Sequence, residues 1–384
     1  MHLQKLGVHF FLNTMHINNI IKYLEEWAPK GIAWEKDNIG LQVGDPKSKV
    51  SNILLALEFD EKVLLQAIKK NCNFIITHHP FIFYPIKSLN FNTDTKSKLI
   101  KELIKNNITL YSAHTNLDYT KDGVSFELAK RIGLQNIDFL EMQESNQYKL
   151  VVYVPEESVE VVSEAIFQSG GGVIGEYSKC SVKNLVEGTF EGSNLSNPTI
   201  GKPNNFETVK EIRLEVLVNS WKLNSIIDVM KLAHPYEEPA YDVFVLKNRN
   251  VNYGAGAIGK LKKSLNIKEF LSQIKSSLNT DGIKYTIGKN TKINKVAVCG
   301  GSCADLMSSA IAAKADVFIT ADIKYHTFQD AENKIMLIDA GHYETEVPVL
   351  NPLKIKLDKF IKSEKSSIKV FKYNGSTNPV KFFN

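Results

Sequence analysis

Arginine is scarce in this sequence of 384 residues, although basic residues outnumber acidic ones by 47 to 42. It occurs only at Arg131, Arg213 and Arg249, so lysine supplies almost all of the excess behind the net charge of +5. Arginine is the usual residue for bidentate recognition of phosphates and bases, and the lysines here are scattered along the chain. The sequence therefore argues against a protein that reads nucleic-acid sequence, and we interpret its basic residues as a solvated surface.

Cysteine is also rare. The four cysteines, Cys72, Cys180, Cys299 and Cys303, are too few for a disulfide framework in so long a chain, and they favour a reducing, cytoplasmic location. Cys299 and Cys303 could form a thiol site after a strand. The favoured interpretation is that they are small residues packed at a strand–helix turn.

Long apolar runs and common nucleotide-binding motifs are missing. No run approaches the roughly 20 apolar residues that span a membrane, so no membrane partner is expected. The apolar stretch at 7–12 is too short for a secretory signal, and we expect the residues before Met15 to be an extension. No Walker loop, dinucleotide fingerprint or Ser-His-Asp signature is present, which argues against the enzyme classes that depend on them.

The most informative stretch is a short apolar run at 74–77 that ends in His78-His79-Pro80. Its β-branched residues predict a buried strand, which Pro80 cannot continue in the centre of a sheet. Both imidazoles are therefore expected at the carboxyl end of a strand, where open α/β sheets bind their ligands. Taken alone, the pair is better explained as two surface histidines in a turn.

Two further apolar runs end in a similar way. The run at 109–113 is followed by His114 and Asp118, and the run at 335–340 is followed by His342 and Glu346. In both, the carboxylate follows the histidine by four residues, so the two side chains share a face if a helix begins there. Imidazole combined with carboxylate suits Zn, Fe, Mn, Co or Ni rather than Ca or Mg.

The three segments together supply six candidate metal ligands, which are His78, His79, His114, Asp118, His342 and Glu346. Six ligands are too many for one closed tetrahedral ion and about the number that two open sites need. We therefore predict a site for two divalent transition-metal ions, with Glu346 as a candidate bridge between them. For His114 a second assignment stays open, since it could orient Asp118 instead of binding metal.

From Met15 to the C-terminus the chain resembles the family of NGG-one-interacting factor three, also called GTP cyclohydrolase I type 2 homologs. The resemblance is carried by THHP at 77–80, AHTNLD at 113–118, GHYETE at 341–346, DNIGLQVG at 37–44, GAIG at 256–259 and VAVCGGS at 296–302. It implies a dinuclear metal site and a toroidal homohexamer, with Asp37 and Asn38 shaping the mouth of the site. Cys303 and Ala321 stand where the family usually has glycine, which argues against tight phosphate-binding turns there.

Predicted strands and helices alternate before residue 140 and again after residue 250, which indicates a three-layer α/β core with a parallel sheet. Between them the predicted order is β-α-β-β-α-β, the order of a ferredoxin-like unit. A chain of this length is expected to form two domains. We therefore predict a metal-binding core in two halves, 15–140 and 250–384, split by an inserted ferredoxin-like α+β domain at 141–249.

Two other polar groups are candidates for function. Asp322 and His326 follow the predicted strand at 316–320 and could be metal ligands. Because the other segments already fill two metal sites, the favoured interpretation is that they face the substrate or orient a ligand, with His326 as a candidate general acid or base. The stretch AHPYEEPAY at 233–241 could hold a second metal through His234 and its two glutamates, or could cap the first site from a neighbouring subunit. A proline-framed turn is the favoured interpretation of that stretch.

Hydrolysis is the most natural chemistry for such a site. We predict a metal-dependent hydrolase that acts on a nucleotide-like or phosphorylated small molecule, by ring opening or by cleavage of a phosphoester or amide. The alternative is a non-enzymatic metal-binding or regulatory protein whose insert senses a ligand, because no general base is evident beyond the metals. The expected partners are further copies of the same chain and a small molecule.

Overall fold

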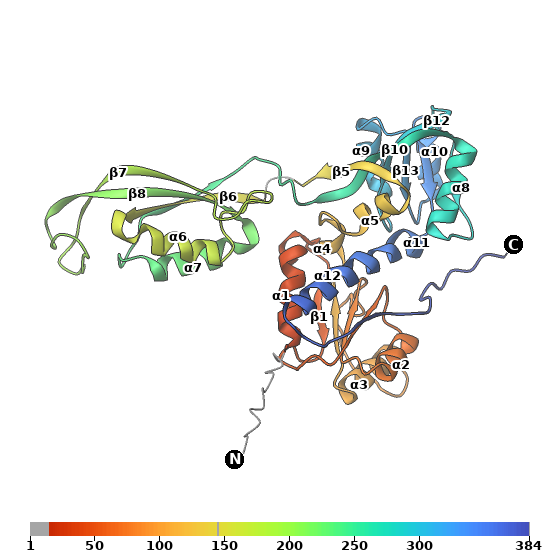
Figure 1. The fold of residues 1–384 in the computed structure, drawn as a ribbon, viewed down its shortest axis with the longest axis horizontal. Helices are drawn as coiled ribbons and strands as arrows, with labels where there is room; N and C mark the ends of the chain where they lie inside the picture. The colour runs from red at the N-terminus through yellow and green to blue at the C-terminus, as the bar shows by residue number, and fades with distance from the viewer. Residues whose placement is uncertain (1–14, 144–145, 384) are drawn as a thin grey trace, which may run out of the picture. The chain divides into compact units, whose positions relative to one another are not determined.

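The computed structural model describes residues 15–143 and 146–383, so the predicted extension before Met15 lies outside the described residues. The chain forms two compact units, and Figure 1 labels their elements. The larger unit contains the residues up to Glu141 and those from Tyr253 onward, and the smaller contains Met142–Asn252. Within the described residues, no helix combines the length and the apolarity needed to cross a membrane.

The first sheet of the larger unit has the strand order β1-β4-β3-β2-β15. Its strands are β1 (Gly40–Val43), β2 (Ile53–Ala56), β3 (Phe74–Thr77), β4 (Thr109–Ser112) and β15 (Val370–Lys372). All residues of β2, β3 and β4 are buried, because helices cover both faces of the sheet. The helices α1 (Ile17–Trp27) and α12 (Leu350–Ser363) pack on one face, and α2 (Glu61–Lys69) and α3 (Thr95–Lys105) pack on the other.

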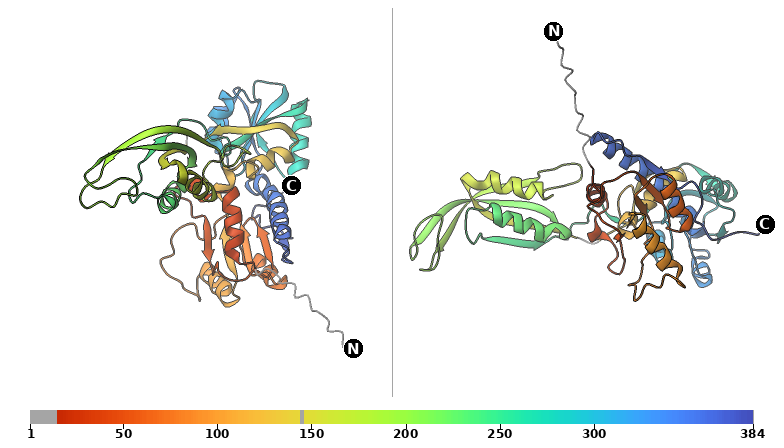
Figure 2. Two further views of the ribbon diagram at one scale, coloured as in Figure 1. Left: turned by 60° about the vertical axis from the view of Figure 1, so that its left-hand side comes forward. Right: turned by 90° about the horizontal axis from the view of Figure 1, so that it is seen from below.

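The second sheet of the larger unit has the order β11-β14-β13-β12-β10-β5. Its strands are β5 (Leu134–Met142), β10 (Gly254–Asn266), β11 (Lys284–Tyr285), β12 (Lys292–Val298), β13 (Val317–Thr320) and β14 (Met336–Asp339). Residues of α9 (Met307–Ala312) and α10 (Tyr325–Ala331) pack on one face of the central strands. The helices α5 (Val124–Arg131) and α8 (Ile267–Leu278) contact β10 and β12. Figure 2 shows the two sheets, the first in red and orange except for β15 and the second mainly in cyan and blue.

The predicted three-layer parallel core is not confirmed in that form. The chain is a mixed α/β protein with several sheets, and the larger unit alone contains two. Strands β2, β3, β4 and β15 run parallel, as do β12, β13 and β14, but β1, β10 and β11 run antiparallel to their neighbours. Hydrophobic patterning identifies a buried strand but carries no information about its direction or its sheet, so the sequence could not separate these arrangements.

The smaller unit has one antiparallel sheet of order β7-β8-β6-β9. Its strands are β6 (Gln147–Pro155), β7 (Ser181–Glu191), β8 (Phe206–Asn219) and β9 (Tyr241–Val245). Two helices, α6 (Val159–Gln168) and α7 (Leu223–Ala233), contribute Ile166, Ile226 and Met230 to its core. These residues pack against alternate residues of β6 and β8, as expected for a sheet with one buried face.

The two chain crossings between the units lie close together. Strands β5 and β10 are neighbours in the second sheet, and a Cβ placed on Gly254 would lie 2.5 Å from the carbonyl oxygen of Glu141. We therefore expect that joining Glu141 to Tyr253 through a short Gly/Ser linker leaves the larger unit folded. Circular dichroism and cooperative thermal unfolding would check this, with the linker inserted into the intact chain as control. An unfolded product would show that the two units share a core.

Candidate metal centre

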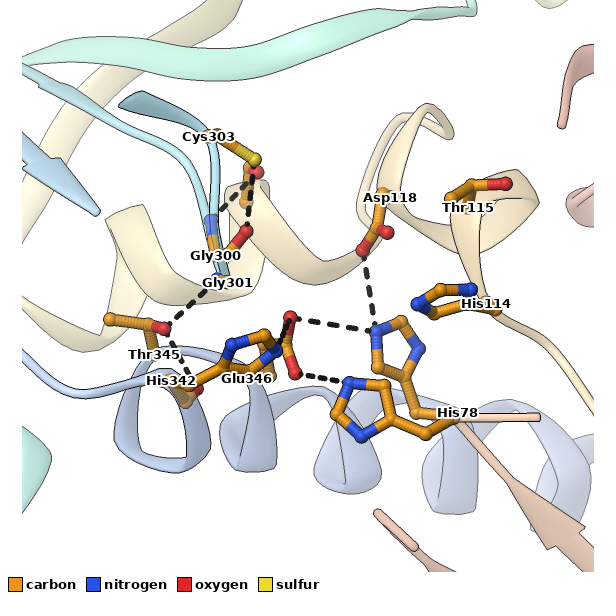
Figure 3. Close-up of polar contacts among 12 residues, drawn as sticks. His78, His114, Thr115, Asp118, Gly300, Gly301, Cys303, His342, Thr345 and Glu346 are labelled. Carbon is orange, nitrogen blue, oxygen red and sulfur yellow. Dashed lines mark hydrogen bonds and ion pairs between the residues drawn. The ribbon is translucent and has the colours of Figure 1, made fainter. Parts of the chain in front are cut away.

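Polar side chains from both sheets of the larger unit meet at the ends of their strands. His78 and His79 follow β3 directly, and the N–H groups of both donate to the carbonyl of Leu57 at the end of the neighbouring strand β2. His114 follows β4 and precedes α4 (Thr115–Asp118), while α11 (His342–Glu346) follows β14 of the second sheet. The structure therefore brings together all six side chains that the sequence nominated as ligands, and Figure 3 labels each of them except His79.

The side chains form two overlapping groups. Ligand atoms of His78, His79 and His114 lie within 4.8 Å of one another, and so do those of His79, His342 and Glu346. His79 belongs to both groups, and its ring centroid lies 5.0–5.3 Å from those of the other three histidines. At this spacing the imidazole rings are neighbours but are not stacked on one another. Three or more nitrogen and oxygen donors in each group are suited to a divalent transition metal.

The buried atoms of His78 and Asp118 support a metal between them. His78 Nδ1 lies 2.8 Å from the carbonyl oxygen of Ala113, which as an acceptor places the proton on Nδ1 and the lone pair on Nε2. His78 Nε2 and Asp118 Oδ1 are 3.5 Å apart, and both are buried without a hydrogen-bond partner among the described residues. Buried polar atoms are nearly always paired, so a cation between these two acceptors fits the site.

Glu346 stands between the two halves of the cluster. Its Oε1 lies 3.1 Å from His342 Nε2 and 3.9 Å from His78 Nε2. Its Oε2 lies 2.9 Å from His79 Nε2 but lacks the geometry of a hydrogen bond. The side chain is only 4% exposed, so these contacts are shielded from solvent. A carboxylate whose two oxygens face imidazoles from both sheets is placed to bridge two ions.

The ionisation of these groups follows from burial and from their neighbours. Burial lowers the pKa of His78 to about 3, and burial raises the pKa of Asp118 to about 7. Burial also opposes the charged forms of His79 and Glu346. In these two residues the attraction of oppositely charged neighbours outweighs the effect of burial on the pKa. The carboxylates of Glu346 and Glu58 raise the pKa of His79 to about 10, and the histidines hold the pKa of Glu346 well below its usual range.

A hydrogen-bond acceptor holds the second nitrogen of each histidine in the cluster. His79 Nδ1 lies 3.1 Å from Glu58 Oε1, His114 Nδ1 lies 2.9 Å from Asp37 Oδ2, and His342 Nδ1 lies 2.6 Å from Asp322 Oδ2. Pairs of this kind set the tautomer and orientation of metal-binding imidazoles. Asp37 was expected near the site, whereas the sequence reasoning missed Glu58. The sequence feature that could have identified Glu58 is a carboxylate two residues after β2, the buried strand that neighbours β3.

Gly301 approaches the cluster through its backbone. It has a φ of +71°, in the left-handed region that favours glycine, and its N–H donates to Thr345 Oγ1 over 3.1 Å. A Cβ at this position would lie 2.2 Å from Glu346 Oε1 and 3.3 Å from His342 Nε2. Because glycine has no Cβ, the Glu346 carboxylate can occupy the space beside this residue.

Of the remaining candidates the structure brings only Asp322 to the cluster, where its carboxylate holds His342. His326 is exposed on α10, where its Nδ1 lies 3.0 Å from Gln329 Oε1 and its ring lies against Tyr325. Its role as an acid or base stays a prediction. His234 has partners at both ring nitrogens, the Tyr153 carbonyl and the Tyr236 N–H, as the turn interpretation expects. Cys303 is half-buried with its Sγ 3.3 Å from the Gly300 carbonyl oxygen, beside the strand–helix turn.

Comparison of the sequence and the fold with known proteins assigns the chain to a family. Residues 15–379 match the model of Duf34/NIF3 (NGG1p interacting factor 3). Curated proteins named GTP cyclohydrolase 1 type 2 homolog are similar to the chain. The protein from Halalkalibacterium halodurans is 37% identical over 366 residues, which cover 94% of this chain and 98% of that protein. The protein from Listeria monocytogenes is 39% identical over 322 residues, covering 83% and 86%.

Solved structures agree with the sequence matches. The crystal structure of a Bacillus cereus protein related to NIF3 superposes with a TM-score of 0.82 at 34% identity, covering 96% of this chain and all of that one. A Staphylococcus aureus protein superposes with a TM-score of 0.76 at 30% identity, covering 96% and 99%. The family model spans nearly the whole described chain, and the full-length relatives exceed 30% identity. This chain therefore belongs to the Duf34/NIF3 family.

Proposed function

We propose that this protein binds two divalent transition-metal ions and hydrolyses a nucleotide-like or phosphorylated small molecule with them. The observation that carries the proposal is the position of His79 and Glu346, which join two groups of ligands from two sheets. The name of the curated relatives, GTP cyclohydrolase 1 type 2 homolog, is consistent with a nucleotide as substrate. When bound, such ions supply Lewis acidity for the attack of water on a ring carbon, carbonyl or phosphoryl group.

The chain's own residues have distinct roles in this proposal. One ion would lie among His78, His114 and Asp118, and the other beside His342 and Glu346. His79 would ligate one of the two ions through Nε2, because its Nδ1 lies against Glu58. The carboxylates of Glu58, Asp37 and Asp322 would hold three imidazoles in the orientation that the metals require. His326 would act on the substrate and not on the metals.

The test is turnover of a panel of nucleotides, phosphomonoesters and phosphodiesters by protein loaded with Zn, Mn, Co, Ni or Fe(II). We expect turnover that chelation abolishes and that restored metal recovers. His326→Gln should lower turnover and leave the metal content unchanged. Protein that carries two ions per chain and turns over no member of the panel would contradict the hydrolase and favour a binding protein.

A cavity in the smaller unit favours the second candidate, a regulatory protein whose insert binds a ligand. The cavity measures about 800 Å³ and its lining contains five glutamates, three aromatic residues and no basic residue. Glu211, only 9% exposed, lies beside Tyr236, whose buried hydroxyl has no geometrically satisfied hydrogen bond among the described residues. A buried carboxylate near an aromatic ring suits an organic cation. Thermal stabilisation by organic amines, lost in Glu211→Gln, would support this function, and no effect from any amine would contradict it.

We also propose that the smaller unit is a ferredoxin-like domain inserted at the point where the chain leaves and re-enters the larger unit. Its elements follow the order β6-α6-β7-β8-α7-β9, and its sheet is antiparallel throughout. A cytoplasmic location is proposed as well, because all four cysteines are free.

The family resemblance leads us to expect a homohexameric ring without sequence-specific affinity for nucleic acid. Light scattering should therefore return a mass well above the 43.2 kDa of one chain. Retention of DNA at low salt should disappear by about 200 mM salt, because lysine–phosphate contacts weaken steeply with ionic strength. A monomer would remove the ring, and salt-resistant binding to one sequence would overturn the small-molecule function.

A further inference from the structure

The C-terminal segment that follows β15 contacts the rest of the larger unit at several points, including Asn374, whose N–H donates to Gln66 Oε1, and the Phe382 ring beside Gly282. Tyr373 still donates its N–H to the Leu55 carbonyl, but from 374 to 383 the chain is exposed except at Thr377 and Asn378. A cavity of about 440 Å³ lies between this segment and the residues around α11, and both Thr377 and Asn378 line it. Because most of the segment is exposed, the polar contacts of its two half-buried residues restrict where this part of it lies.

Thr377 is linked to the candidate metal centre through one carboxylate. Its hydroxyl donates to Glu58 Oε2, while Glu58 Oε1 lies 3.1 Å from His79 Nδ1. The side chain of Glu58 is 32% exposed, so without a second partner it would be free to turn toward solvent. Thr377 therefore restricts the carboxylate that orients His79, the imidazole that both groups of ligands share.

Asn378 reaches the other half of the same centre. Its Nδ2 donates to Glu344 Oε1 over 2.8 Å. Glu344 lies on α11 between His342 and Glu346, the two ligands that the second sheet contributes. Glu58, in contrast, follows β2 of the first sheet. Two consecutive residues of the C-terminal segment thus bind one carboxylate from each sheet: Thr377 binds Glu58 and Asn378 binds Glu344.

We propose that Thr377 and Asn378 are positioning residues of the metal centre, which clamp its two halves together from the C-terminal tail. The inference rests on the proposed metal site and adds to it a part of the chain far from the histidine motifs in sequence. Neither residue is placed to bind metal: Thr377 acts through Glu58, and Asn378 acts through α11.

The test compares the full-length protein with Thr377→Val, Thr377→Ser and Asn378→Ala. Valine keeps the shape of threonine and removes its hydroxyl, while serine keeps the hydroxyl. Cobalt(II) affinity is measured by competition with a chromophoric chelator, and the cobalt absorption spectrum reports the ligand geometry. We expect Thr377→Val to weaken the affinity about tenfold and to alter the spectrum, the scale known for residues that orient metal ligands. Serine should restore both readouts, and Asn378→Ala should weaken binding to a similar extent.

Two further variants separate positioning from general stability. Thr93→Val removes a hydroxyl from an exposed turn outside the cluster and should change neither readout. Glu58→Ala should weaken cobalt binding by about 10–100-fold, and adding Thr377→Val to it should cause no further loss, since both act through one carboxylate. Fully additive losses would overturn the proposed link through Glu58.

The outcomes distinguish this inference from the proposed function. Wild-type protein that binds no cobalt would overturn the metal centre and the clamp with it. Wild-type binding that Thr377→Val and Asn378→Ala leave unchanged would overturn the clamp alone. A loss in Thr377→Val that serine does not restore would show that the hydroxyl is not responsible, which also contradicts the clamp.

Discussion

Glu346→Ala is expected to remove most of the bound transition metal, which would be one of the largest effects of a single substitution in this protein. Both oxygens of Glu346 face imidazoles, with His342 Nε2 at 3.1 Å and His79 Nε2 at 2.9 Å. Its loss would deprive both proposed ions of a shared negative charge in a site where the side chain is only 4% exposed. The loss of affinity should exceed the roughly 10–100-fold that follows from changing residues which only orient ligands.

Elemental analysis of the purified variant, expressed as ions per chain, is the measurement. Glu332→Ala is the matched control, because Glu332 is exposed at the end of α10 and the same charge is removed there. Replacing His79, which belongs to both groups, should deplete the metal as strongly as Glu346→Ala. Full metal content in Glu346→Ala would show that the two halves do not share one site.

Gly301→Ala is expected to lower both the metal content and the free energy of unfolding. The left-handed φ of +71° costs a residue with a Cβ about 1 kcal/mol relative to glycine. The larger effect comes from the Cβ itself, which would lie 2.2 Å from Glu346 Oε1 and force the carboxylate away from the imidazoles. We expect the sum to reach about 2–4 kcal/mol, the scale of overpacking added to backbone strain.

Gly175→Ala is a matched control for this substitution. Gly175 has a φ of +57°, in the same left-handed region, but a Cβ there would meet nothing within 4 Å. It should therefore carry the backbone cost without any change in metal content. Chemical denaturation and elemental analysis of both variants separate the two contributions. If Gly301→Ala kept its metal and lost no more stability than Gly175→Ala, the close approach to Glu346 would have no functional importance.

The candidate ligands could be nominated from sequence because each follows a buried strand. The rule that side chains at the carboxyl ends of strands gather at one edge needs no knowledge of the partner strands. It therefore reached His78, His114 and Glu346, which the structure brings together although 36 and 232 residues separate neighbouring motifs along the chain. His326 obeys the same local pattern but lies exposed on α10 among Tyr325 and Gln329, because the pattern does not state which way a helix turns.

By itself the sequence determined the buried strands, the kinds of side chain that are candidate metal ligands and the scarcity of arginine, since these follow from local hydrophobicity and side-chain chemistry. Only the tertiary structure decided which strands share a sheet, that β1, β10 and β11 run antiparallel, and which acceptors hold the histidines. Glu58 and Thr377 show the reason. Their contact joins residues 319 positions apart, and hydrogen bonds at that separation depend on how the chain closes rather than on any periodicity within it.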